Sequence, residues 1–151
     1  MADRAGTFTT ASADETEAVG QRIAAELGPG DVVLLAGALG AGKTCLVRGI
    51  AGALGVPSDA VHSPSYTLVN EYPARGGRRV VHADGYRLRD DATLDDLGLE
   101  ESQEDGAIVL LEWPRGFVAT DEATTWSVEM TIDDAERRTI RVTPPPGRPL
   151  M

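Results

Sequence analysis

The chain has 151 residues, 42% hydrophobic and 25% charged, which is an ordinary composition for one globular domain with a single core. Its formal net charge of −10 is spread along the chain and argues against unaided binding to nucleic acid or to an anionic membrane. A single cysteine, Cys45, excludes an internal disulfide, and neither a long apolar run nor a signal-like N-terminus is present, so we expect a cytoplasmic protein without membrane contact.

The first part of the chain predicts a strand at 7–10 followed by a helix over 13–27. Ser12 stands three residues before Glu15, which is the spacing of a capping box at a helix start. The apolar run DVVLLAG at 31–37 is too short for a helix and is typical of a strand buried on both faces of a parallel sheet.

A second helix is predicted over 43–54, where apolar residues recur at helical spacing until a glycine and a proline end it. The segments YTLVNEY and RRVVHADGY then predict a hairpin around a turn at 74–77. The acidic stretch 90–105 includes an expected short helix near 93–97. A second fully apolar strand, AIVLLEW, begins at Ala107.

A final hairpin is predicted from WSVEMTI and RRTIRV around the turn 133–136. The last residues, 144–151, read PPPGRPLM and are typical of a disordered tail. We therefore expect a single domain over 1–143. Helices alternating with apolar strands, together with two hairpins, predict an α/β protein with a mixed sheet of parallel and antiparallel strands.

The stretch GALGAGKT contains the most informative motif, because Gly37, Gly42, Lys43 and Thr44 complete the pattern G-x-x-x-x-G-K-T of a P-loop. Its glycines let backbone N–H groups surround a phosphate, and the following helix adds the positive end of its dipole. Lys43 is the only lysine among fourteen basic residues. A compact ammonium suits the β- and γ-phosphates of a nucleotide, whereas a planar guanidinium does not fit the same cradle. The alternative is a glycine-rich turn without a ligand.

Two carboxylates are candidates for the same site. Asp84 follows the apolar segment VVHA, and Glu112 ends AIVLL, so both should emerge at the carboxyl ends of buried strands, as the P-loop does. Phosphate chemistry with Mg²⁺ needs an acid to hold the ion and a group to orient the attacking water. Either acid alone could equally be an exposed residue at a strand end.

Other residues carry weaker signals, and their structural alternatives stay open. A lone histidine beside a strand is more often structural than catalytic, a tryptophan after Glu112 could cover a nucleotide or simply pack, and two arginines after Asp84 could face solvent. Cys45 is most simply a small buried residue on a helix. These weaker candidates are His62, His82, Arg87, Arg89 and Trp113.

Five segments in this order resemble the TsaE family, formerly YjeE, of small bacterial P-loop ATPases that act in the synthesis of threonylcarbamoyladenosine in tRNA. The segments are GALGAGKT (37–44), HSPSYTLVNEY (62–72), HADGYRL (82–88), LGLEE (97–101) and LLEWPRG (110–116). The resemblance covers about residues 12–142 and implies a three-layer P-loop fold, with helices flanking a mixed sheet. It departs from the usual family pattern at Ser65 and Gly85.

The resemblance also implies roles for individual residues. Thr44 and Glu112 would hold Mg²⁺ together with Asp84, the essential aspartate of the H-x-D-x-Y-R motif, and Lys43 would act with the two acids in catalysis. Ser63 to Thr67 would form a switch-like segment, and either Arg137 or Arg138 would approach the nucleotide. The full set of expected ATP contacts is Thr16, Gly37, Leu39, Gly40, Ala41, Gly42, Lys43, Thr44, Cys45, Thr67, Trp113 and Arg137.

The implied partners are TsaD, which transfers the threonylcarbamoyl group to an adenosine beside the tRNA anticodon, and TsaB. ATP hydrolysis by this chain would reset that pair between turnovers, and tRNA would be held by the partners. Two alternatives remain: a small-molecule P-loop kinase, which usually needs an arginine-rich lid that the acidic stretch 90–105 does not supply, and an adaptor that binds nucleotide without hydrolysis. A GTPase is disfavoured because no N-K-x-D motif is present.

Overall fold

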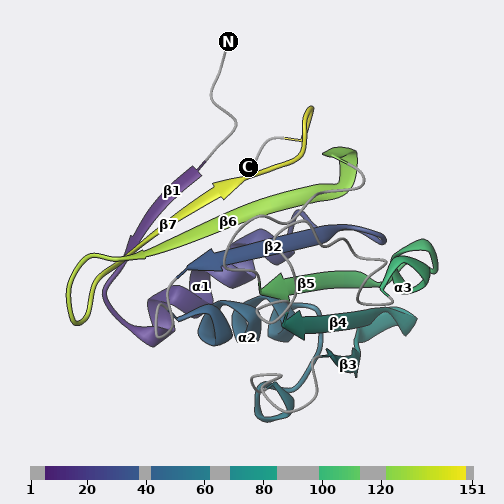
Figure 1. The fold of residues 1–151 in the computed structure, drawn as a ribbon. Coiled ribbons are helices and arrows are strands. Elements are labelled where there is room, and N and C mark those ends of the chain that lie inside the picture. Colours follow the sequence, from purple (N-terminus) through teal and green to yellow (C-terminus); the bar gives the residue numbers. More distant parts are fainter. Residues whose placement is uncertain (1–5, 38–41, 62–68, 85–98, 113–121, 149–151) are drawn as a thin grey trace.

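The structure is a computed structural model that describes residues 6–37, 42–61, 69–84, 99–112 and 122–148, with the side chains of Ser58, Asp84 and Glu122 excepted. Figure 1 shows one mixed sheet with helices packed against it. The described elements are β1 (Gly6–Thr10), α1 (Ala13–Ala24), β2 (Val32–Gly37), α2 (Lys43–Ala53), β3 (Val69–Pro73), β4 (Arg79–Asp84), α3 (Glu100–Glu104), β5 (Ile108–Glu112), β6 (Thr125–Ile132) and β7 (Arg138–Thr143).

The sheet has seven strands in the order β1-β7-β6-β2-β5-β4-β3. Its centre is parallel, since β2 pairs with both β5 and β6, and β4 pairs with β5. Its two sides are antiparallel, because β3 pairs with β4 at one side, while β6, β7 and β1 follow one another at the other. The predicted α/β class, the mixed sheet and both hairpins are therefore confirmed (Figure 1).

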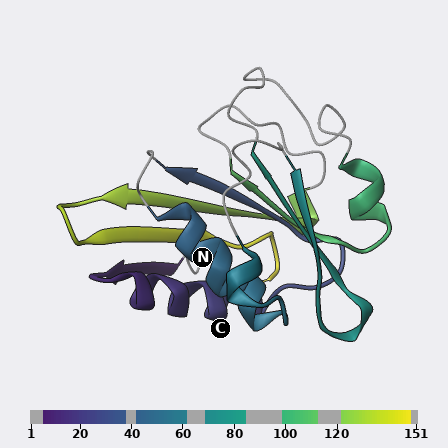
Figure 2. The same cartoon turned by 90° about the horizontal axis from the view of Figure 1, so that it is seen from below.

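Helices α1 and α2 lie on the same side of the sheet (Figure 2). Every second residue of the central strands faces them, so Val33, Leu35 and Leu110 join one core cluster with the buried faces of both helices. The alternate residues form a smaller cluster on the opposite face. Leu99, just before α3, packs into that second cluster.

The two long helices are held in one relative position by a close crossing of glycines. A Cβ atom built on Gly49 would lie 2.2 Å from the backbone oxygen of Glu17, and one on Gly20 would lie 2.5 Å from that of Leu46. Only glycine fits at such a distance between backbones. The crossing therefore fixes the start of α1 relative to the start of α2, where the P-loop motif lies.

The start of α1 agrees with the capping-box prediction and adds one detail. Ser12 Oγ accepts a hydrogen bond from the backbone N–H of Glu15 at 3.2 Å. In return, the side chain of Glu15 accepts a hydrogen bond from the N–H of Ala11, one residue earlier than in the standard capping box. The helix ends at Ala24, three residues before the predicted end, because the chain turns through Leu27 and Gly28 towards β2.

The C-terminal segment differs from the disordered tail that its composition predicts. Pro144 and Pro145 are buried, and Arg148 donates to both carboxylate oxygens of Asp31, at 2.6 and 2.7 Å. The same guanidinium lies 5.5 Å over the ring of Trp126, and its bond with Asp31 raises the pKa of Arg148. A residue that pairs with a buried acid is thus hidden in a proline-rich, polar sequence, while residues 149–151 lie outside the described part.

The remaining differences concern the acidic stretch. The structure places a short helix at Glu100–Glu104, which the sequence did not predict, and the expected helix near 93–97 lies outside the described residues. None of the helices described is long and apolar enough to cross a membrane.

Candidate functional site

Three strand ends meet at one edge of the sheet, as the sequence predicts. In the parallel pairing of β2 with β5, Leu35 lies opposite Glu112, so Gly37 lies two residues further along the same edge. In the pairing of β4 with β5, Asp84 lies opposite Glu112. The backbone positions of Gly37, Asp84 and Glu112 are therefore neighbours. Crevices at the carboxyl ends of parallel strands are where open α/β sheets bind ligands.

The helix that begins at this edge is suited to an anion. Gly42 precedes α2 with φ +99°, a left-handed conformation that strongly favours glycine, and no side chain caps the helix start. Within the described part of the chain no side chain occupies the first backbone N–H groups of α2, and no acidic residue stands in the first turn. These are the properties of a helix N-terminus that binds phosphate.

Lys43 connects this helix start to the end of β2. Its Nζ donates a hydrogen bond to the backbone oxygen of Gly37 at 2.9 Å, across the glycine-rich loop. No other partner of the amine occurs among the described residues. The acceptor that the described residues offer the ammonium is a neutral carbonyl oxygen, and a charged phosphate oxygen would form a stronger interaction with it.

Glu112 is nearly buried, with its side chain 11% exposed, on the sheet face that α1 and α2 cover. Its Oε2 lies 2.5 Å from Nε2 of His82, whose side chain is completely buried on the neighbouring strand β4. The described residues supply no partner for Oε1. Within the described part of the chain, His82 thus holds one oxygen of the carboxylate, and the other oxygen is a candidate ligand for an ion.

These residues fit a magnesium ion better than a metal held wholly by protein. No described group of three or more His, Cys, Asp or Glu side chains could enclose a metal. Mg²⁺ is usually held by one or two protein oxygens together with phosphate oxygens and water. Glu112 Oε1 and the hydroxyl of Thr44, in the first turn of α2, are hard oxygen donors of the required kind, and neither has a partner among the described residues.

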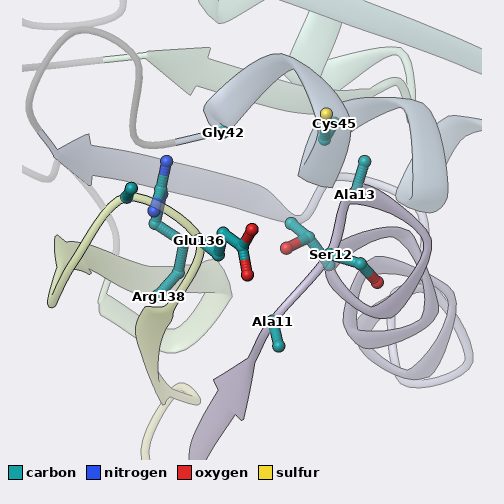
Figure 3. Close-up of a pocket in the computed structure, with 9 residues that line it drawn as sticks. Ala11, Ser12, Ala13, Gly42, Cys45, Glu136 and Arg138 are labelled. Carbon is teal, nitrogen blue, oxygen red and sulfur yellow. The ribbon is translucent and has the colours of Figure 1, made fainter.

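A hollow of about 360 Å³ lies beside Gly42 (Figure 3). It is bounded by the start of α1, the start of α2 and the β6–β7 turn, and Ser12 and Glu136 reach into it from opposite sides. Its volume is within the range of about 300–1,000 Å³ that is typical of small-molecule sites. The lining residues are Ala11, Ser12, Ala13, Thr16, Gly42, Cys45, Ala135, Glu136 and Arg138.

Three of the predicted nucleotide contacts, Thr16, Gly42 and Cys45, line this hollow. Thr16 is 4% exposed, and its hydroxyl shares a hydrogen bond of 2.9 Å with that of Thr10, so its position is fixed. Cys45 is only partly buried and not the buried core residue of the simplest interpretation. Its place in the first turn of α2 brings its side chain next to Gly42.

The two candidate arginines, Arg137 and Arg138, occupy different positions on the β6–β7 turn. Arg138 lines the hollow, whereas Arg137 is exposed on the turn. The carboxylate of Asp134 orders this turn by accepting hydrogen bonds from the N–H groups of Arg137 and Glu136, and these bonds lower the pKa of Asp134. Arg138 also donates to the backbone oxygen of Asp134 at 2.9 Å.

Several predicted residues lie outside the described part of the chain: Leu39, Gly40, Ala41, His62, the segment 63–67 with Thr67, Arg87, Arg89 and Trp113. The sequence underrated His82, because a single histidine in an apolar strand has no pattern that reveals its partner. It also missed Ser12 and Glu136 as lining residues. A serine at a helix cap and a glutamate in a turn have ordinary structural explanations. They come together because β1 pairs with β7, with Thr10 opposite Arg138.

The central parallel strand, the glycine-rich connection and the helix that starts at Lys43 and Thr44 define an α/β protein of the P-loop type. Residues 10–140 match the sequence model of a family described as threonylcarbamoyl adenosine biosynthesis protein TsaE. The chain therefore belongs to the TsaE family, whose role is in the biosynthesis of tRNA threonylcarbamoyladenosine.

Individual relatives agree with this assignment. The chain is 42% identical to the TsaE protein of Streptomyces coelicolor over 119 residues, which are 78% of each chain. It is 34% identical to the Aquifex aeolicus TsaE protein over 132 residues, which are 87% of this chain and 90% of that one. Among solved structures, YdiB of Bacillus subtilis superposes with a TM-score of 0.71 at 26% identity, over 95% of this chain and 88% of that one.

Proposed function

We propose that this chain is the Mg²⁺-dependent ATPase subunit of tRNA threonylcarbamoyladenosine synthesis. The family places the chain in that pathway. The observation that carries the proposal of ATP chemistry is the joint placement of Lys43 and Glu112. The amine bonds the backbone oxygen of Gly37 at the end of β2, and Glu112, one of whose oxygens has no partner among the described residues, stands in register beside that strand.

In this proposal each residue has a separate task. Lys43 and the first N–H groups of α2 bind the β- and γ-phosphates, and the glycines of 37–42 let the backbone approach them. Thr44 and Glu112 hold a magnesium ion, which neutralises developing charge on the phosphate oxygens. Asp84, opposite Glu112 on the next strand, acts at the same ion or orients the attacking water.

The hollow beside Gly42 takes the nucleoside part of ATP. It adjoins the phosphate loop through Gly42 and Cys45 and is bounded by polar groups of Ser12, Thr16 and Arg138. A nucleotide whose phosphates lie on the start of α2 would reach this hollow directly. Thr67, Trp113 and the loop residues Leu39, Gly40 and Ala41 remain proposed contacts from the family resemblance, as does Arg137.

The proposed partners are TsaD and TsaB, with tRNA bound through them. ATP binding and hydrolysis by this chain would alternate its grip on that pair and reset it after each transfer. The net charge of −10 supports an indirect role with respect to RNA, because an acidic protein is repelled by the phosphate backbone.

The test is phosphate release from ATP without an added acceptor, measured with and without TsaD and TsaB. Release that depends on Mg²⁺ and rises with the partner pair is the expected result, with Lys43→Ala as the inactive control. Transfer that requires an acceptor molecule would indicate a kinase, and tight binding without turnover would indicate an adaptor; either result would contradict the proposed hydrolysis. Co-purification with TsaD and TsaB in the presence and absence of ATP tests the partners separately.

A further inference from the structure

The buried contact between His82 and Glu112 has no part in the proposed function so far. His82 lies on β4, opposite Leu110 of β5 and two residues before Asp84. Its side chain has no exposed surface, and its Nε2 lies 2.5 Å from Glu112 Oε2. A buried polar side chain costs free energy unless its hydrogen bonds are satisfied. The presence of a histidine at this position therefore needs an explanation.

The hydrogen-bond pattern identifies which nitrogen carries the proton. An ionised carboxylate only accepts hydrogen bonds, so Nε2 donates to Glu112. Nδ1 is buried and has no partner among the described residues. A proton there would be a buried donor without an acceptor, whereas an unprotonated Nδ1 is the less costly state. The contact therefore places an Nε2–H donor against Glu112 Oε2.

We propose that His82 is a positioning residue that fixes one oxygen of Glu112 and thereby presents the other to the magnesium ion of the bound nucleotide. The inference rests on the proposed function, because it needs Glu112 to be a magnesium ligand. A glutamate side chain that is already held in place loses less conformational freedom when it binds an ion. Groups that orient a metal ligand in this way change metal affinity by about 10–100-fold when they are removed.

The contact cannot be explained by packing of the sheet alone. Leu110, the register partner of His82, and Leu35, the register partner of Glu112, are both apolar members of the same core cluster. Leucine at position 82 would continue that cluster without an unpaired buried nitrogen. A histidine that leaves Nδ1 unpaired is poorly suited to stability and well suited to holding a carboxylate.

Two substitutions separate positioning from packing. His82→Gln can place an amide N–H near the position of Nε2 and so keep a donor to Glu112, whereas His82→Leu fills a similar volume without any donor. We measure the binding of a fluorescent ATP analogue in EDTA and then titrate Mg²⁺ into the complex. Equilibrium unfolding of each variant reports stability separately from ion binding.

The expected result is that His82→Leu weakens the apparent Mg²⁺ affinity of the nucleotide complex by about 10–100-fold, with nucleotide affinity in EDTA unchanged. His82→Gln should restore the Mg²⁺ affinity to within about threefold of the wild type, because the donor is retained. Equal Mg²⁺ affinity in the wild type and in His82→Leu, or equal losses in both variants, would overturn the inference. If His82→Leu fails to fold, His82→Met serves as the apolar variant under the same criteria.

The wild-type titration keeps the two proposals distinguishable. If nucleotide binding by the wild type is indifferent to Mg²⁺, the proposed function fails at its metal, and the His82 inference fails with it. If the wild type depends on Mg²⁺ and His82→Leu does so to the same extent, the proposed function stands and only the inference is contradicted.

Discussion

Two buried carboxylates stand at opposite ends of the same region of the sheet, and their surroundings differ. Asp31, just before β2, is 2% exposed, and its carboxylate accepts three hydrogen bonds: Arg148 donates to both oxygens, and the N–H of Gly28 donates to Oδ2 at 2.8 Å. Glu112, beside the other end of β2, receives one bond from the described residues, from His82.

The difference separates an acid that supports the fold from one that is available to a ligand. Both oxygens of Asp31 are used by the protein, and its partner also covers Trp126, so this pair closes the end of the sheet away from the P-loop. The residues that the structure describes use one oxygen of Glu112, and its side chain keeps some exposure. Burial alone does not distinguish the two acids; the number of satisfied oxygens does.

The largest effect is expected for Asp84→Ala, at the end of the sheet where Glu112 and the P-loop motif lie. Loss of a group that orients water or assists the ion should lower ATP turnover by about 10²–10⁴-fold, the usual contribution of such a residue. Nucleotide affinity should fall much less, because Lys43 and the start of α2 remain. Steady-state phosphate release and nucleotide titration measure the two quantities. Asp59→Ala, at an exposed acid outside the candidate site, is the control, and wild-type turnover in Asp84→Ala would remove Asp84 from the mechanism.

At the opposite end of the sheet, where Asp31 lies, Arg148→Ala should lower the free energy of unfolding by about 3 kcal/mol, because it leaves the buried carboxylate of Asp31 without its cation. Urea denaturation measures the loss, and nucleotide affinity of the folded protein should stay unchanged. Arg78→Ala, at an exposed arginine, should change stability by less than about 0.5 kcal/mol. A loss for Arg148→Ala no larger than for Arg78→Ala would show that the tail does not hold this end.

Lys43→Ala should have the opposite effect to Arg148→Ala: it should weaken nucleotide binding and leave stability almost unchanged. Among the described residues the amine bonds the Gly37 oxygen and no other group, so stability should hardly change. Loss of its charged hydrogen bonds to phosphate should cost about 1.5–3 kcal/mol of binding, which is about 10–150-fold in affinity. Isothermal titration with ATP measures this loss. Lys43→Arg should not restore binding if the loop requires a compact ammonium, and unchanged affinity in Lys43→Ala would count against the phosphate cradle.

The smallest of these effects is expected for Glu112→Gln, which sharpens the comparison of the two acids. The amide oxygen of glutamine still accepts from His82, so the fold should be retained. The loss of a charged ligand should weaken Mg²⁺-dependent nucleotide binding by at least about tenfold. Asp31→Asn is the matched variant, and it should lower stability without changing the Mg²⁺ dependence. If Asp31→Asn weakened the Mg²⁺ dependence and Glu112→Gln lowered only the stability, the comparison of the two acids would be refuted.

Much of the fold could be predicted because its central elements have clear patterns. The apolar runs that became β2 and β5, and the helical spacing that became α2, are local signals that tertiary packing only reinforced. The short helix α3 was missed because five residues of an acidic stretch carry no helical periodicity. The anchored tail was missed because Arg148 acquires its role from Asp31, which is distant in the sequence.

The candidate site divides in the same way. Gly42, Lys43 and Glu112 could be found from the sequence, because each belongs to a motif or ends an apolar strand. The contact of His82 with Glu112 and the hollow between Ser12 and Glu136 could not, since they depend on strand register and on the glycine crossing of α1 with α2. The choice of Arg138 over Arg137 as a lining residue likewise depends on the geometry of one turn.

The most direct test of the central claim is a crystal structure with a non-hydrolysable ATP analogue and Mn²⁺, in which anomalous scattering locates the ion. The account predicts the ion on the Thr44 hydroxyl and one oxygen of Glu112, with His82 on the other oxygen and Lys43 moved from Gly37 to the phosphates. An ion bound away from Glu112, or a nucleotide that leaves the Lys43 contact with Gly37 in place, would contradict it.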